Sequence, residues 1–254
     1  MIQYFASDYS GAPFVLFDSA HWTALGVVAL VVAALGSLGR LHTTKYGTWI
    51  RYGLATLLII NELARQAWLI YYDEWTIQWN LPLHLCSIFV WLSAYMLLTK
   101  NHAIFEFAYF LGIAGALQPL LTPDAGKYGF PHFYPVQLFI SHGGIIAAVV
   151  HMAASLRWRP YWSSIKKVII WGNVYLVFIT VVNLLIGSNY LYTLHKPHVM
   201  TLLDFLGPWP WYLISAEIVA LGIFLILYSP YLIKDRFNLG DSGNNNDIHR
   251  LHND

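Results

Sequence analysis

Seven long apolar stretches, separated by short polar connections, run through most of the chain. Each is long enough to cross the hydrocarbon core of a bilayer as a helix, which takes about 17–25 residues. They cover residues 20–38, 49–71, 82–99, 103–121, 133–155, 167–187 and 210–233. The connections leave no room for a separate soluble domain. The pattern therefore predicts an all-α integral membrane protein, with residues 1–236 forming a single bundle of seven transmembrane helices.

Composition agrees with a membrane protein. Of the 254 residues, 57% are hydrophobic and 11% are charged, and the mean hydropathy is +0.52. Soluble domains carry about 25% charged residues. The segment 237–254 differs, because it contains the polar sequence NLGDSGNNNDIHRLHND, and we expect it to be a disordered cytoplasmic tail. The net charge of +1, without a large basic block, gives no indication of nucleic acid binding.

Lysine and arginine gather in alternate connections between the apolar stretches. Cytoplasmic loops of membrane proteins carry an excess of these residues. The N-terminal segment instead contains Asp8 and Asp18. We therefore expect the N-terminus outside the cell membrane and the C-terminus in the cytoplasm. The basic residues behind this orientation are Arg40, Lys45, Arg51, Lys100, Arg157, Arg159, Lys166, Lys167, Lys234 and Arg236.

Several polar side chains interrupt the apolar stretches, and such groups in a membrane suggest function. Glu62, Arg65 and Gln66 have helical i, i+3, i+4 spacing and should share one face. At 1.5 Å per residue, one polar side chain in each of four stretches lies roughly 6–14 Å below the outer surface. These four are Arg65, Cys86, His142 and Glu217, and Gln118 lies in the outer half of a fifth stretch. Their depths predict an outward-opening polar cavity, but do not determine whether the side chains meet.

Cys86 is the only cysteine, so the chain has no intramolecular disulfide and no cluster of cysteines for a metal. A thiol attacks as the thiolate and needs a neighbouring base. With the helix beginning near Pro82 and capped by Asn80, Cys86 would sit in the second turn, where the helix dipole has largely faded. His84 lies roughly 200° around the helix from Cys86. His142 is therefore the better candidate base.

The remaining polar residues have candidate roles around that pair. Gly143 and Gly144, next to His142, allow a helix or a substrate to approach the backbone closely. Arg65 could bind a phosphate or an oxyanion, and Gln66 or Gln118 could stabilise the oxyanion. Glu217 could orient a histidine or pair with Arg65.

Structural roles explain the same residues without chemistry. Cys86 could be a small packing residue, and Glu62 with Arg65 a structural ion pair. His142 could form an interhelical hydrogen bond, and Glu217 could be a buried structural partner. His195 and His198 flank Pro197 in a loop, and we expect no metal site there.

Two motifs resemble a known family. LPLHLCS at 81–87 and LLDFLGPWPWYLISAE at 202–217 resemble the YwaF-type family of bacterial membrane proteins, over all seven stretches but not the tail. That family is similar to an animal membrane acyltransferase that places polyunsaturated acyl chains on ether phospholipids. The resemblance implies that Cys86 is a nucleophile and His142 its base. It does not carry over the acyl specificity.

These observations favour a cysteine-dependent lipid acyltransferase or transacylase that needs no cofactor. A membrane phospholipid would donate the acyl chain and a lysophospholipid would accept it, since acyl-CoA is not available outside the cell membrane. Water as the acceptor would make the protein a phospholipase. Two alternatives stay open: a lipid- or solute-binding or transport protein that uses the same cavity, and a structural or partner-binding membrane protein. The oligomeric state does not follow from the sequence.

Overall fold

The computed structural model describes residues 2–41, 45–197 and 202–250, and these residues form helices and loops without a β-strand. The fourth apolar stretch is one continuous rod made of α4, a π-helical turn and α5. Short 3₁₀ turns occur at Ile2–Tyr4, Tyr190–Tyr192 and Leu202–Leu206. The helices are α1 (Ser19–Leu41), α2 (Lys45–Tyr71), α3 (Leu85–Thr99), α4 (His102–Phe107), the π-helical turn (Ala108–Gly112), α5 (Ile113–Leu121), α6 (Phe133–Ser155), α7 (Trp162–Ile186) and α8 (Trp211–Arg250).

Each predicted apolar stretch coincides with one of these rods. Among the described residues, five rods are long and apolar enough to span a membrane. They are Ser19–Arg40, His102–Leu121, Phe133–Ser155, Trp162–Ile186 and Trp211–Asp235. Helix α2 is long but carries Arg51, Glu62 and Arg65, and α3 has 15 residues. The chain is thus a multi-pass membrane protein, and the count of seven crossings and their orientation stay predictions.

Several helix boundaries differ from the sequence prediction, and two of them differ by five residues or more. Helix α7 starts at Trp162 rather than at residue 167. Helix α8 continues to Arg250, through most of the segment 237–254 that we expected to be disordered, and 251–254 lie outside the described residues. After Pro230 no further proline removes a backbone donor from this helix. The separation of the tail from the bundle remains a prediction.

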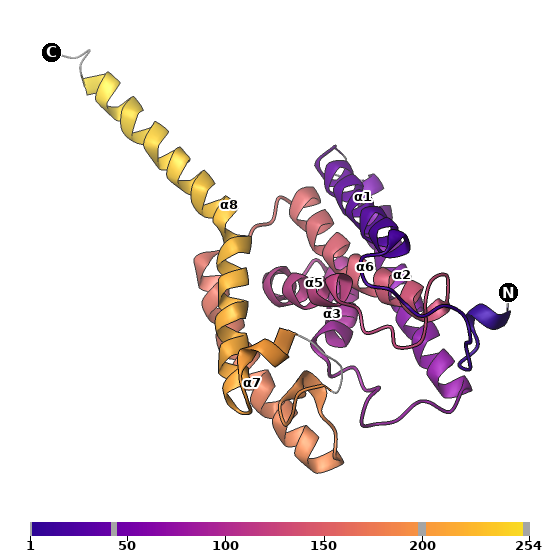
Figure 1. The fold of residues 1–254 in the computed structure, drawn as a ribbon. Coiled ribbons are helices and arrows are strands. Elements are labelled where there is room, and N and C mark those ends of the chain that lie inside the picture. The colour runs from indigo at the N-terminus through magenta and orange to yellow at the C-terminus, as the bar shows by residue number, and fades with distance from the viewer. Residues whose placement is uncertain (1, 42–44, 198–201, 251–254) are drawn as a thin grey trace.

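Helix α6 lies at the centre of the bundle, and 72% of its most apolar stretch is buried. It packs against α1, α2, α3 and α5 (Figure 1). Small residues allow this contact, as predicted for the glycine pair. A Cβ on Gly143 would lie 2.9 Å from Val28 of α1, and a Cβ on Gly144 would lie 2.8 Å from Leu58 of α2. The two glycines thus let three helices meet closely.

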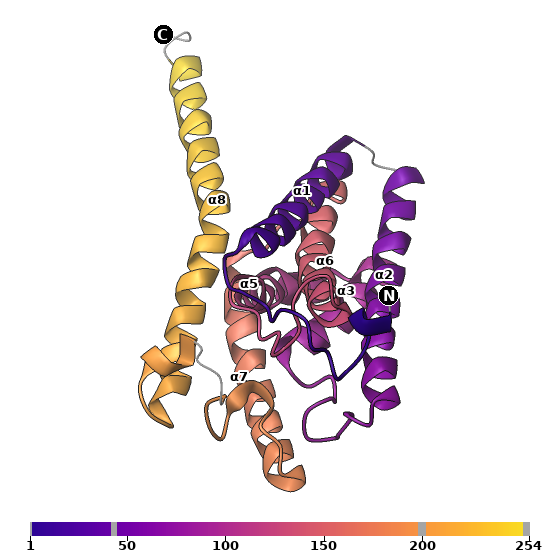
Figure 2. The same cartoon turned by 45° about the vertical axis from the view of Figure 1, so that its right-hand side comes forward.

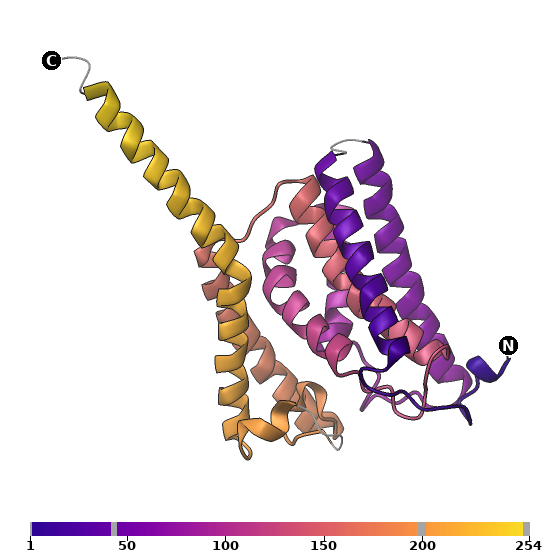
Figure 3. The ribbon, with the colours of Figure 1, turned by 45° about the horizontal axis from the view of Figure 1, so that its top comes forward.

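Helices α7 and α8 stand to one side of this bundle (Figure 2). Only 11% of the apolar stretch of α7 and 17% of that of α8 are buried. The C-terminal part of α8 extends away from the other helices (Figure 3). Arg159, just before α7, forms an ion pair of 2.6 Å with Asp235 of α8. Tyr109 of the π-helical turn donates to the Leu227 carbonyl at 2.9 Å. Contacts such as the one to Tyr109 tie the α7–α8 pair to the bundle, and the mostly unburied surfaces of both helices are available to lipid.

Candidate functional site

The candidate site lies at the end of the bundle where α2 finishes and α3 and α6 begin. We call this end the Cys86 end. The segment before α3 is held by tertiary hydrogen bonds rather than by helical ones. The Leu81 amide donates to the Tyr190 hydroxyl at 2.9 Å, and the Tyr175 hydroxyl donates to the Leu83 carbonyl at 3.0 Å. His84 is the N-cap residue of α3.

Cys86 is therefore in the first turn of α3, not in the second turn as the sequence suggested. Asn80, the expected cap, instead accepts a hydrogen bond from the Thr76 amide at 2.8 Å. The first turn of a helix carries unpaired amides and the positive end of the dipole, which favour a negative charge. The amides at the start of α3 therefore stabilise a negative charge on Cys86 more than a second-turn position would. Cys86 is half-buried.

Cys86 of α3 and His142 of α6 lie close enough for the thiol and the imidazole to interact electrostatically. His142 Nδ1 lies 2.7 Å from the Leu138 carbonyl. A carbonyl only accepts, so Nδ1 carries the proton and Nε2 of the neutral ring has a free lone pair. Nε2 is buried and has no hydrogen-bond partner of good geometry in the described part of the chain. This arrangement leaves Nε2 available as a base.

Arg65 is fixed beside this pair by its neighbours on α2. Its Nη2 lies 2.8 Å and its Nε 3.2 Å from the two oxygens of Glu62, and the Gln66 amide donates to Glu62 at 2.7 Å. The predicted shared face is thus confirmed. Arg65 interacts electrostatically with Cys86 and with His142. Its Nη1 forms no hydrogen bond within the described part of the chain, which leaves part of the guanidinium available to a ligand.

Both polar atoms of the Gln66 side chain are hydrogen-bonded within the protein, so Gln66 is not available to bind a substrate. Its amide nitrogen also donates to the Asn80 carbonyl at 3.2 Å, and its oxygen accepts from the Trp75 indole at 2.7 Å. Gln66 and Glu62 therefore support Arg65 rather than face the thiol.

His84 contacts the loop that follows α7 and also interacts electrostatically with Arg65. Its Nδ1 lies 3.5 Å from the Leu191 amide, and its ring packs against Tyr190 at 5.0 Å and Tyr192 at 5.6 Å between ring centroids. His84 thus joins α3 to the loop that follows α7.

Two tyrosines near the thiol were missed by the sequence analysis. Tyr134 and Tyr192 both interact with Cys86, and Tyr134 also interacts with Arg65. Burial raises the pKa of Tyr192, so its hydroxyl keeps its proton at neutral pH and is able to donate. A sequence signal existed for Tyr134, since Tyr134, Leu138 and His142 are spaced i, i+4, i+8 on one helix. For Tyr192 the position depends on how its loop folds.

That loop is anchored by Asn183 at the end of α7, whose side chain is fully buried. Its amide nitrogen donates to the Tyr190 carbonyl at 2.8 Å and to Thr193 Oγ1 at 2.9 Å. Its oxygen accepts from Ser188 Oγ at 2.6 Å and from the Tyr190 amide at 2.8 Å. Leu191 and Tyr192 then adopt φ of 56° and 53°, a region that is costly for residues with a Cβ. The anchored loop holds the Tyr192 ring against His84.

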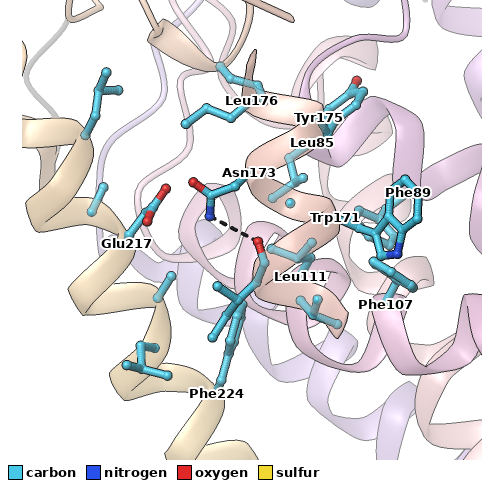
Figure 4. A pocket seen from close by; sticks show the side chains of 18 of the residues that line it. Leu85, Phe89, Phe107, Leu111, Trp171, Asn173, Tyr175, Leu176, Glu217 and Phe224 are labelled. Atoms are coloured by element: carbon cyan, nitrogen blue, oxygen red, sulfur yellow. Dashed lines mark hydrogen bonds between the residues drawn. The ribbon is translucent and has the colours of Figure 1, made fainter. Parts of the chain in front are cut away.

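Two predicted residues are not part of this cluster. Gln118 is exposed on α5 and donates to Thr122, the C-cap residue of that helix, at 3.2 Å. Glu217 is exposed on α8, where it lines an apolar groove and faces Asn173 of α7 (Figure 4). Similar depth did not bring them to the thiol, because α8 stands apart from the bundle and Gln118 is turned outward.

Sequence comparison identifies the group of proteins to which the chain is related. The model of the TMEM164 family matches residues 16–228, which is most of the chain. The chain belongs to the TMEM164 family. The part shared with the TMEM164 family is a membrane region that contains Arg65, Cys86 and His142 and ends within α8. This match does not carry the YwaF-type label, so that narrower relation stays a prediction. No curated protein and no solved structure matches this member of the TMEM164 family.

Proposed function

We propose that this membrane protein is a cysteine-dependent lipid acyltransferase or transacylase. The observation that carries the proposal is the proximity of Cys86 to His142, whose Nδ1 is bound to a carbonyl and whose Nε2 has no partner among the described residues and is left as the base. A nucleophile beside a base that a third group orients is the arrangement that covalent catalysis needs. The resemblance of LPLHLCS to the motif of a lipid acyltransferase supports the same assignment.

In the first half-reaction, His142 Nε2 takes the proton of the Cys86 thiol, and the thiolate attacks the carbonyl carbon of a phospholipid ester. The tetrahedral intermediate collapses as the ester C–O bond breaks. The departing lysophospholipid oxygen takes the proton from His142, and an acyl-thioester remains on Cys86.

In the second half-reaction, the hydroxyl of a lysophospholipid gives its proton to His142 and attacks the thioester carbonyl. The new ester forms as the C–S bond breaks, and the proton on His142 returns to Cys86. No oxidant or cofactor enters either half. Water in place of the lysophospholipid would release a fatty acid, which is phospholipase activity.

Arg65 and the tyrosines have separate roles in this proposal. The free part of the Arg65 guanidinium binds the lipid phosphate, and Glu62 holds it in position. The Tyr134 and Tyr192 hydroxyls donate to the oxyanion of the tetrahedral intermediate. These two hydroxyls take the oxyanion-stabilising role that the sequence analysis gave to Gln66 or Gln118. The Gln66 amide is already hydrogen-bonded to other residues, and Gln118 is not part of the cluster.

The basic connections favour placing the Cys86 end on the outer side of the cell membrane. The thiol would then meet phospholipids of the outer leaflet. This orientation makes a phospholipid ester, rather than acyl-CoA, the acyl donor of the proposal.

Intact-protein mass spectrometry tests the proposal. Wild type, Cys86→Ala and Ser93→Ala are purified, incubated with phospholipid, and measured before and after hydroxylamine. Ser93 lies two turns further along α3, and its hydroxyl has no hydrogen-bond partner among the described residues. We expect an acyl mass that hydroxylamine removes on wild type and on the control Ser93→Ala, and none on Cys86→Ala. Full lipid turnover by Cys86→Ala would refute the nucleophile. A missing adduct on wild type, with lipid still bound to it, would instead favour a lipid-binding or transport protein.

A further inference from the structure

A cavity lies beside the polar cluster, between α3, α7, α8 and the π-helical region. Its volume is about 650 Å³, which is within the range of about 300–1,000 Å³ found for ligand sites. Its wall is mostly apolar and includes Phe89, Leu111, Trp171, Leu221 and Phe224 (Figure 4). We call this cavity the α7–α8 groove.

The few polar groups of the groove do not make its floor polar. Asn173 and Glu217 face each other across it, but both residues are exposed and so belong to its rim. The hydroxyls of the two tyrosines in its wall are turned to backbone carbonyls, Tyr175 to Leu83 and Tyr212 to Tyr192. The floor is formed by buried side chains such as Phe89 and Phe224, each 3% exposed.

The position of the groove identifies the chemistry of its occupant. Its walls α7 and α8 are two of the rods apolar enough to span a membrane, and both are mostly unburied. The groove therefore opens to lipid hydrocarbon, and an apolar cavity of this kind excludes water. One end of the groove reaches the wall of the polar cluster. Leu85, the neighbour of Cys86, and Leu191, the neighbour of Tyr192, both line it.

We propose that the α7–α8 groove binds one acyl chain of a phospholipid, with the ester end of the chain at Leu85 and Leu191. The chain enters sideways from the bilayer between α7 and α8. This binding site stands without any covalent step. If the proposed acyl transfer also occurs, the chain in the groove is the one whose ester reaches Cys86.

Two glycines offer a matched pair of variants. Gly172 of α7 lines the groove, and a Cβ there would meet one atom within 4 Å, Leu111 Cδ1 at 3.9 Å. Gly222 of α8 is exposed, and a Cβ there would meet nothing within 4 Å. Gly172→Trp therefore fills the groove, whereas Gly222→Trp adds the same side chain outside it.

The test is photolabelling of the full chain in nanodiscs that contain phosphatidylcholine with a diazirine in one acyl chain. Labelled residues are mapped by peptide mass spectrometry. We expect labels on the groove floor at Phe89 and Leu111, at least fivefold fewer of them in Gly172→Trp, and a change of less than twofold in Gly222→Trp. Equal labelling of the floor in both variants would overturn the proposal. So would labels confined to exposed residues such as Val177 and Leu184, which any surrounding lipid reaches.

Two further probes separate other occupants from a phospholipid chain. Floor labelling by a diazirine fatty acid but not by the phospholipid would assign the groove to free fatty acids and overturn the proposal. Labelling at Asn173 and Glu217 by a phospholipid with the diazirine in its headgroup would show that the groove binds a headgroup, and would also overturn the proposal. Cys86→Ala keeps the floor labels if the groove binds a chain, even when it loses the thioester, so the two proposals fail separately.

Discussion

Replacing Asn183 tests whether the loop after α7 is held in place by one buried amide. Asn183→Ala removes four hydrogen bonds to Ser188, Tyr190 and Thr193, all within 2.6–2.9 Å. At about 0.5–1.5 kcal/mol each, they contribute about 2–6 kcal/mol to the free energy of unfolding. In a chain of this size each kcal/mol lowers Tm by about 2–4 °C. Even the lower bound therefore predicts a fall of about 4–8 °C.

Asn173→Ala is the matched control on the same helix. Asn173 is exposed and donates only to the Ile169 carbonyl one turn earlier, at 3.0 Å. Exposed substitutions usually change stability by about 0.5 kcal/mol or less, so Tm should move by about 2 °C at most. Both variants are heated in the same detergent while tryptophan fluorescence is recorded. Equal Tm values for the two variants would refute the anchoring role of Asn183.

Two further variants test contacts between helices. Lys167→Ala leaves the buried Glu106 carboxylate without its ion pair of 3.0 Å, and should cost about 1.5–3 kcal/mol. The control is Lys166→Ala, at the exposed neighbouring residue. An equal fall in Tm for both variants in a thermal scan would contradict a stabilising Lys167–Glu106 ion pair. Gly39→Val brings a Cβ 3.1 Å from the Ser155 backbone nitrogen of α6, and should cost about 1–3 kcal/mol. A side chain at Gly53 meets open space, so the denaturant midpoint of the control Gly53→Val should be close to that of wild type. Similar midpoints for Gly39→Val and Gly53→Val would argue against a tight α1–α6 contact.

The sequence was sufficient for the helical rods because the length of an apolar stretch is set by the bilayer and by local composition. The start of α3 was wrong by three residues for a different reason. Leu81 and Leu83 are held by Tyr190 and Tyr175, which lie about a hundred residues further along the chain. No local pattern around Pro82 contains that information.

Within the site, periodicity predicted partners on the same helix but not partners between helices. The shared face of Glu62, Arg65 and Gln66 followed from their spacing. Glu217 has a depth similar to that of Cys86, yet lies on the separate helix α8. Depth in the membrane is only one coordinate of a side chain. Whether two side chains on different helices meet also depends on how each helix is rotated and which helices lie next to it, and both are set by the packing of the whole bundle.

The shortness of α3 has a consequence for the bilayer around the protein. Its 15 residues reach about 22 Å along the helix axis, which is less than the hydrocarbon thickness of about 30 Å. If α3 is one of the predicted crossings, loops rather than helix occupy the remaining depth at the Cys86 end. Lipids next to such a short span thin locally, at a cost of fractions of a kcal/mol per ångström. In the proposed orientation, thinning brings the ester groups of neighbouring phospholipids toward the thiol, so we expect the access of Cys86 to lipid to decrease as the membrane becomes thicker.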